Sequence, residues 1–128
     1  MSGKTNDDVK FLNIIHAPNL TLFPRAIENF FPNLNAIYIN NHSISTLNGD
    51  ELDPFADLFW FRLNRNPKLE RIPGNLFKST PKMKHVAFYG NKIKHVGEHL
   101  LTNLNLIYLD FRVIALISFR IPALLCSQ

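Results

Sequence analysis

The sequence predicts an α/β solenoid of about five stacked coils. Short parallel strands would form a concave face, and single helical turns or irregular segments would form the convex face. Three observations lead to this prediction: a frame of apolar residues recurs along the chain, each copy alternates between apolar and polar residues, and an asparagine follows the alternating stretch in two copies. At 128 residues, with 46% hydrophobic and 19% charged residues, the chain suits one globular domain.

The frame begins at Val9, Leu34, Leu58, Met83 and Leu104, so successive copies are 25, 24, 25 and 21 residues apart. Such near-constant spacing is typical of repeat proteins. Within each copy two apolar residues alternate with polar ones, as in a half-buried strand. These inward-facing pairs are Leu12 and Ile14, Ile37 and Ile39, Phe61 and Leu63, Val86 and Phe88, and Ile107 and Leu109.

The position after each strand holds Asn66 and Asn91 in the third and fourth copies. A sharp buried turn leaves backbone groups without partners, and an Asn side chain can both donate to and accept from them. A solvent-facing turn Asn is the alternative. His42 could donate one hydrogen bond at this position, whereas Ala17, followed by Pro18, has no polar side chain. Arg112 looks too large and charged, which puts the last coil in doubt.

The pattern L-x-x-L-x-L-x-x-N-x-L over residues 9–117 resembles the leucine-rich repeat family, most closely its extracellular members from insects. The resemblance implies a right-handed coil, a concave binding surface and no catalysis. Residues 1–8 are expected to be a disordered lead, and residues 118–128 an apolar tail. Repeat arrays need polar caps, so we expect either that this tail folds over the last coil or, slightly favoured, that the chain is part of a longer array.

Between the strands lie return segments, each with an apolar residue that we expect to point inward from the convex side. These residues are Ile27, Leu52, Phe77 and Leu100.

The residues between the inward positions should face solvent on the concave sheet. Several are of the types enriched at binding hot spots. The predicted partner-binding residues are Tyr38, Asn40, Trp60, Arg62, Asn64, His85, Tyr89 and Tyr108. Aromatic residues are also good strand formers, so packing of Trp60 on its neighbours is the alternative interpretation.

Charge offers a second hypothesis for function. The net charge is +4, and residues 62–94 are rich in Lys and Arg. Weak polyanion binding through this stretch is possible by counterion release, but no nucleic-acid motif accompanies it. Solvated lysines in loops are the ordinary explanation.

No nucleophile motif, phosphate loop or dinucleotide fingerprint occurs, so we expect neither an enzyme nor a cofactor. His95 and His99 lack a third metal ligand, and Cys126 is the only cysteine. A membrane span is not expected, because Arg112 and Arg120 interrupt the apolar C-terminal stretch. Sequons at Asn19 and Asn41 and the family resemblance favour an extracellular location, whereas the sequence as written has no signal peptide.

The sequence therefore predicts a non-catalytic module that binds a protein or peptide on its concave sheet. A truncated or purely structural repeat segment without a ligand remains the alternative, with self-association through uncapped ends as one consequence.

Overall fold

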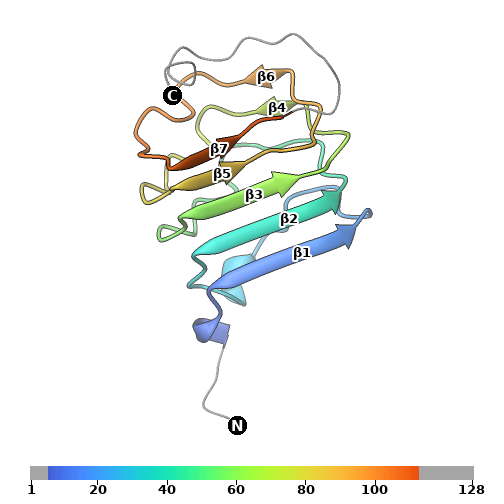
Figure 1. The fold of residues 1–128 in the computed structure, drawn as a ribbon. Coiled ribbons are helices and arrows are strands. Elements are labelled where there is room, and N and C mark those ends of the chain that lie inside the picture. The colour runs from blue at the N-terminus through green and yellow to red at the C-terminus, as the bar shows by residue number, and fades with distance from the viewer. Residues whose placement is uncertain (1–5, 113–128) are drawn as a thin grey trace.

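The chain coils into a solenoid whose successive turns stack on one another (Figure 1). The computed structural model describes residues 6–112. One strand from each coil joins a parallel five-stranded sheet in the order β1-β2-β3-β5-β7. These strands are β1 (Phe11–Ala17), β2 (Ala36–His42), β3 (Trp60–Asn64), β5 (His85–Ala87) and β7 (Tyr108–Asp110). The predicted parallel-strand solenoid is confirmed.

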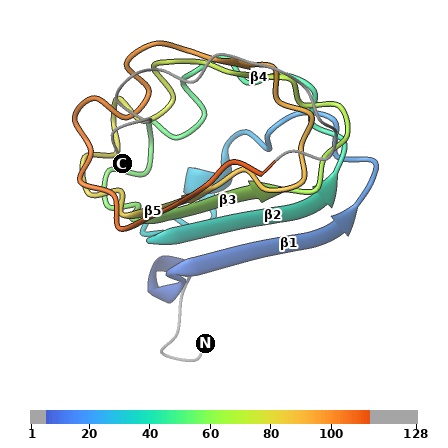
Figure 2. The same cartoon turned by 45° about the horizontal axis from the view of Figure 1, so that its top comes forward.

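A second, two-stranded parallel sheet lies across the coil from the first. It pairs β4 (Arg71–Ile72) with β6 (His95–Val96), and Figure 2 shows β4 opposite the five-stranded sheet. Within residues 6–112 the helices are two short 3-10 turns, η1 (Asn6–Asp8) and η2 (Ile27–Asn29). The return segments are thus mostly irregular, and η1 falls within residues 1–8, the predicted lead. Residues 118–128, the expected apolar tail, lie outside the described residues.

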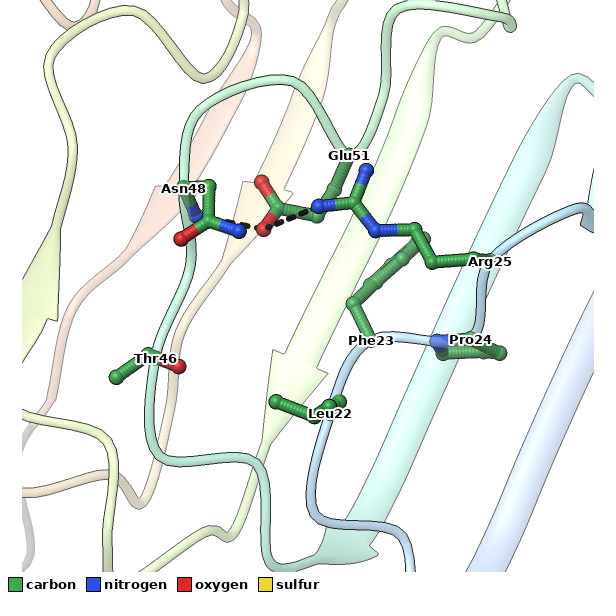
Figure 3. A pocket seen from close by; sticks show the side chains of 7 residues that line it. All are labelled: Leu22, Phe23, Pro24, Arg25, Thr46, Asn48 and Glu51. Atoms are coloured by element: carbon green, nitrogen blue, oxygen red, sulfur yellow. Dashed lines mark hydrogen bonds and ion pairs between the residues drawn. The ribbon is translucent and has the colours of Figure 1, made fainter.

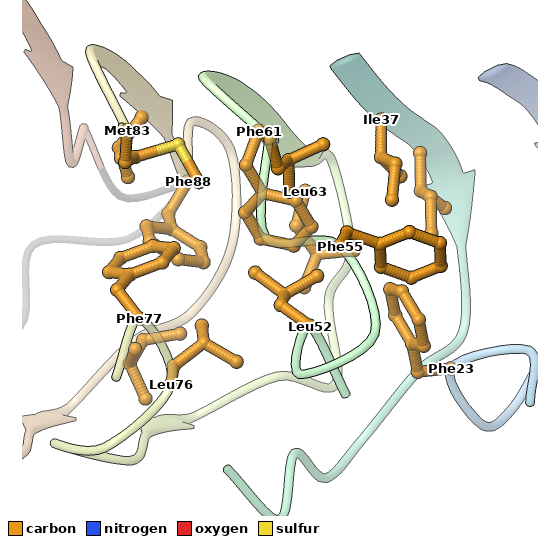
Figure 4. Close-up of a cluster of buried hydrophobic side chains, with 14 of the residues drawn as sticks. Phe23, Ile37, Leu52, Phe55, Phe61, Leu63, Leu76, Phe77, Met83 and Phe88 are labelled. Carbon is orange, nitrogen blue, oxygen red and sulfur yellow. The ribbon is translucent and has the colours of Figure 1, made fainter. Parts of the chain in front are cut away.

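The core fills the space between the two sheets (Figure 4). Ile37, Phe61, Leu63 and Phe88 are fully buried, as the alternation predicts. Because a short strand covers little apolar surface by itself, burial is completed only by the coils on either side. The residues expected to point inward from the return segments are also buried: Ile27, Leu52, Phe77 and Leu100.

The first coil is less well covered than the middle ones. β1 has a neighbouring strand on one side only, and Leu12 and Ile14 are partly buried. In β2 the equivalent residues, Ile37 and Ile39, are fully buried. The first coil therefore gains less free energy from apolar burial than its neighbours.

The predicted alignment of the last coil is wrong by two residues. His85 pairs with Tyr108 and Val86 pairs with Leu109, whereas the repeat frame aligns Val86 with Ile107. Ile107 is 74% exposed, and Phe111 instead packs on Phe88 with ring centroids 5.1 Å apart. Both alignments turn Leu109 towards the core, where it is partly buried, but the observed one places the larger Phe111 ring beside Phe88 where the repeat frame places Leu109. Arg112 therefore does not occupy the asparagine position.

A left-handed residue lies at or shortly after the carboxyl end of β1, β2, β3 and β5. These residues are His16 (φ 52°), Asn41 (φ 63°), Arg65 (φ 58°) and Gly90 (φ 79°). Gly and Asn adopt this conformation readily, whereas it costs other residues about 1–2 kcal/mol. The repeat thus imposes the same backbone bend on unlike side chains.

The next residue in the third and fourth coils is a buried asparagine that bonds backbone groups in its own and in the adjacent coil. Asn91 Nδ2 donates to the carbonyl oxygens of Leu63 and Phe88, both at 2.7 Å, and its Oδ1 accepts the Asn66 N–H at 3.1 Å. Asn66 Nδ2 donates to the Ile44 carbonyl, and its Oδ1 accepts the Lys68 N–H at 3.1 Å. Both residues have no exposed surface, so they do not act as solvent-facing turn residues.

His42 occupies the same position in the second coil, 2% exposed. Its Nδ1 accepts the Ile44 N–H at 3.1 Å, so this ring nitrogen accepts a bond where the sequence suggested donation. Its Nε2 is buried without a partner among the described residues. Burial lowers the pKa of the imidazole to about 4, because the charged form has lost its solvation.

Candidate functional site

The solvent-facing side of the five-stranded sheet, which we name the outer face, carries every residue predicted to bind a partner. Strand pairing aligns these side chains in rows that cross the sheet. The first row is Phe11, Ala36, Trp60, His85 and Tyr108. The second row is Asn13, Tyr38, Arg62, Ala87 and Asp110. The third row begins Ile15, Asn40 and Asn64, and Tyr89 lies beyond Asn64.

Five rings form a continuous series across all five strands, which we name the aromatic row: Phe11, Tyr38, Trp60, His85 and Tyr108. Successive ring centroids are 4.6, 5.6, 4.3 and 6.2 Å apart, and Trp60 stacks on His85 with an interplanar angle of 22°. Tyr38 belongs to the second row but reaches Phe11 and Trp60, because Ala36 between them has only a methyl group. Trp60 thus packs on its neighbours and still remains half-exposed.

Arg62 lies beside the middle of the aromatic row. Its guanidinium carbon is 4.8 Å from the Tyr38 ring centroid and 5.3 Å from that of Trp60, within the range of cation–π attraction. The Tyr38 pKa is raised by burial, and the charge of Arg62 opposes this rise. Arg62 Nε is buried and has no hydrogen-bond partner within residues 6–112.

The polar side chains of the third row differ from each other in their hydrogen bonding. Asn64 Oδ1 accepts the Tyr89 N–H at 2.9 Å and so helps to hold the next coil. Asn40 Oδ1 is buried and finds no partner in the described part of the chain. Asn40 therefore has a buried acceptor that no described group uses.

Tyr89 lies between two arginines. The guanidinium carbons of Arg65 and Arg112 are 5.1 and 4.5 Å from its ring centroid. Arg112 also binds Asp110 through its Nε and Nη2, with its Nη2 2.7 Å from Oδ2, and Tyr108 donates its hydroxyl to the same carboxylate at 3.1 Å. These hydrogen bonds, chiefly those from the Arg112 side chain, hold the pKa of Asp110 below its usual value. The sequence alignment missed Arg112 as an outer-face residue because the fifth copy was misaligned.

Several charges of the basic stretch are neutralised between coils, away from the outer face. Lys78 pairs with Asp53 at 3.0 Å, Lys82 with Asp57 at 2.6 Å and Lys94 with Glu70 at 3.7 Å. The two partners in each pair are about one coil apart in sequence. These pairs are largely exposed, so each contributes little to stability. They do reduce the charge available to a polyanion.

A cavity of about 300 Å³ opens between the first two return segments (Figure 3). Its lining residues include Leu22, Phe23, Arg25 and Glu51. The buried Glu51 carboxylate accepts the backbone N–H groups of Asn48 and Gly49, at 2.6 and 2.8 Å, and lies 3.6 Å from Arg25. Its acceptors are thus already used to hold the turn, and the cavity offers a ligand no unpaired buried charge.

Three other features considered from the sequence are a metal site, a membrane span and the two sequons. No group of three His, Cys, Asp or Glu residues within residues 6–112 is placed to hold a metal ion. A search of the same residues finds no helix with the length and apolar character needed to cross a membrane. Asn19 and Asn41 of the two sequons are exposed, and Asn41 Nδ2 lies 3.2 Å from His16 Nδ1.

Comparison of the chain with protein-family models, with curated proteins and with solved structures found no match. The chemistry of the outer face is therefore interpreted from its own residues.

Proposed function

We propose that this chain is a leucine-rich-repeat module that binds a protein or peptide through the outer face of its five-stranded sheet, without catalysis. The repeated apolar frame and the Asn side chains that bond between coils support the repeat assignment. The observation that carries the binding proposal is the aromatic row, with Arg62 packed beside it.

The packing of these rings favours binding for an energetic reason. Side chains that already contact one another lose little conformational freedom when a partner covers them. Tyr, Trp and Arg also bury large surfaces and retain polar groups for orientation. Phe11 and Tyr108, at the two ends of the row, are 49% and 37% exposed, so a ligand that crosses the strands finds apolar surface along its whole path.

Selection of peptides from a displayed random library tests this proposal. We expect the wild-type chain to enrich a family of sequences, and Trp60→Ala to weaken the best of them by at least about tenfold, the size typical of a hot spot. Phe30→Ala is the matched control, because Phe30 is 60% exposed at the end of η2, away from the outer face.

Two results would contradict the proposal. One is the absence of any enriched sequence, and the other is an equal loss of affinity in Trp60→Ala and Phe30→Ala. Thermal unfolding of both variants, followed by circular dichroism, separates loss of binding from loss of folding.

A further inference from the structure

We infer that the ligand of the outer face is an acidic peptide segment, one of whose carboxylates binds Arg62 between Tyr38 and Trp60. This inference rests on the proposed function and adds the chemistry of the ligand. It comes from the contrast between two arginines of the same surface.

Arg112 shows how the fold satisfies a guanidinium on this sheet. Its Nε donates to Asp110 Oδ1 at 3.0 Å and its Nη2 to Asp110 Oδ2 at 2.7 Å. Such paired bonds between a planar guanidinium and a carboxylate are stronger than neutral hydrogen bonds. Arg112 therefore has the acid that its geometry requires.

Arg62 lacks such a partner. Its Nε is buried and unbonded, and no ion pair to it forms within residues 6–112. Arg62 on β3 pairs with Ala87 on β5, and Ala87 pairs in turn with Asp110 on β7. Arg62 and Asp110 are therefore two strands apart. Asp110, moreover, is already bonded to Arg112. Arg62 thus has no acid of its own among the described residues, and its half-exposed guanidinium would gain charge-assisted hydrogen bonds from a ligand carboxylate.

The two rings beside Arg62 hold its guanidinium in place before a ligand arrives. The guanidinium carbon lies 4.8 Å from one ring centroid and 5.3 Å from the other. Less side-chain freedom is therefore lost on binding. A lysine at this position would have neither the planar stacking nor the Nε donor.

The charges of the outer face also favour an acidic partner. Arg62, Arg65 and Arg112 lie on or beside the sheet, and the carboxylate of Asp110 pairs with Arg112. A peptide can supply a carboxylate for Arg62 together with apolar side chains that cover the exposed rings of the aromatic row. A sulfated polysaccharide supplies charge without apolar side chains, so an acidic peptide fits this face better.

Trp60 fluorescence provides the readout, because Trp60 is the single tryptophan of the chain. The probes are the best library-selected peptide and its twin in which each Asp or Glu is replaced by Asn or Gln. We expect Asp or Glu in every enriched sequence and at least about tenfold weaker binding of the neutral twin. Arg62→Gln should weaken the acidic peptide by a similar factor, and Arg62→Lys by about threefold or more.

Arg71→Gln is the matched control. Arg71 is exposed on β4, in the opposite sheet, so its replacement removes the same charge from the other side of the solenoid. Its affinity for the acidic peptide should stay within about twofold of wild type. Equal losses in Arg62→Gln and Arg71→Gln would overturn the inference, because they would mean general attraction to a chain with a net charge of +4.

Failure of the inference is distinguishable from failure of the proposed function. If the selection enriches peptides without acids, and Trp60→Ala abolishes that enrichment in the same display selection, the acidic ligand is overturned and the outer face is kept as a binding surface. Heparin is the competitor for a polyanion site. If heparin displaces the peptide and binds more tightly than a peptide of equal total charge, the acidic-peptide inference is overturned in favour of polyanion binding.

Discussion

The middle coils and the first two coils use the same apolar frame but differ at the residue after the strand. Asn66 and Asn91 bond backbone groups of their own and the adjacent coil, and neither is exposed. His42 bonds one backbone N–H and buries a second ring nitrogen unpaired. Ala17 has no polar side chain and is only half-buried. Apolar spacing is therefore sufficient to form a coil, whereas full hydrogen bonding of its turn depends on one amide.

The difference follows the burial of the coils. A turn in the middle of the stack has no access to water, so each backbone group there must find a partner in the protein. The turn after β1 lies at the edge of the sheet, where water can replace a missing side chain. The requirement for Asn therefore weakens towards the first coil.

Removal of a middle-coil amide should have the largest effect. Asn91→Ala leaves the Leu63 and Phe88 carbonyls and the Asn66 N–H without their partner. Each unsatisfied buried group costs about 1–3 kcal/mol, so we expect the free energy of unfolding to fall by about 3–5 kcal/mol. Urea unfolding followed by circular dichroism measures this change.

Asn105→Ala is the control for that experiment. Asn105 is exposed, so its replacement should change the free energy of unfolding by no more than about 0.5 kcal/mol. Similar unfolding midpoints for Asn91→Ala and Asn105→Ala would show that the buried amide does not hold the coils together.

Acid should act on the second coil through His42. Its pKa is lowered from 6.5 to about 4 in the folded chain, so the unfolded chain binds more protons between these values. Stability is then fully present above about pH 6.5 and is lost as the pH falls towards 4. The loss should reach up to about 3 kcal/mol, since one pKa unit corresponds to about 1.4 kcal/mol.

His42→Asn isolates this contribution, because Asn does not titrate and suits the position in the next two coils. We expect the unfolding free energy of the wild type to fall more than that of His42→Asn as the pH is lowered from 7 to 4. Equal pH dependence of the two proteins would mean that His42 is solvated in the folded state.

Addition of an amide to the first coil should have the smallest effect. Ala17→Asn provides the side chain, but no described coil precedes β1 to offer a partner. We expect the free energy of unfolding to change by less than about 0.5 kcal/mol. A gain similar in size to the loss in Asn91→Ala would show that burial does not set the requirement for Asn.

The alignment of the first four coils could be predicted from sequence, because strand alternation and repeat spacing are local patterns. Phe61, Leu63 and Val86 face the core, and Tyr38 and Trp60 face outward, as the period of two requires. The last coil could not be aligned in this way. Apolar residues at Leu104, Leu106, Ile107, Leu109 and Phe111 satisfy two frames, and the choice depends on contact with Phe88.

The placement of the candidate residues on one face could be predicted from sequence, but the contacts among their side chains could not. Sequence placed Trp60 and Arg62 on one face, since both lie at outward positions of one strand. The reach of Tyr38 over Ala36, and the place of Arg112 beside Tyr89, depend on side chains of adjacent coils. Such contacts join residues about one coil apart, which a local pattern does not describe.

By itself, the sequence determined the repeat, the inward and outward faces of each strand, and the positions of Asn66 and Asn91. The tertiary structure alone decided which charged groups have partners. Asp110 neutralises Arg112, whereas Arg62 has no acid partner within residues 6–112, because Ala87 stands between Arg62 and Asp110 in the paired strands. Whether a charge is satisfied depends on three-dimensional distance, and in this solenoid the nearest side chains come from different coils.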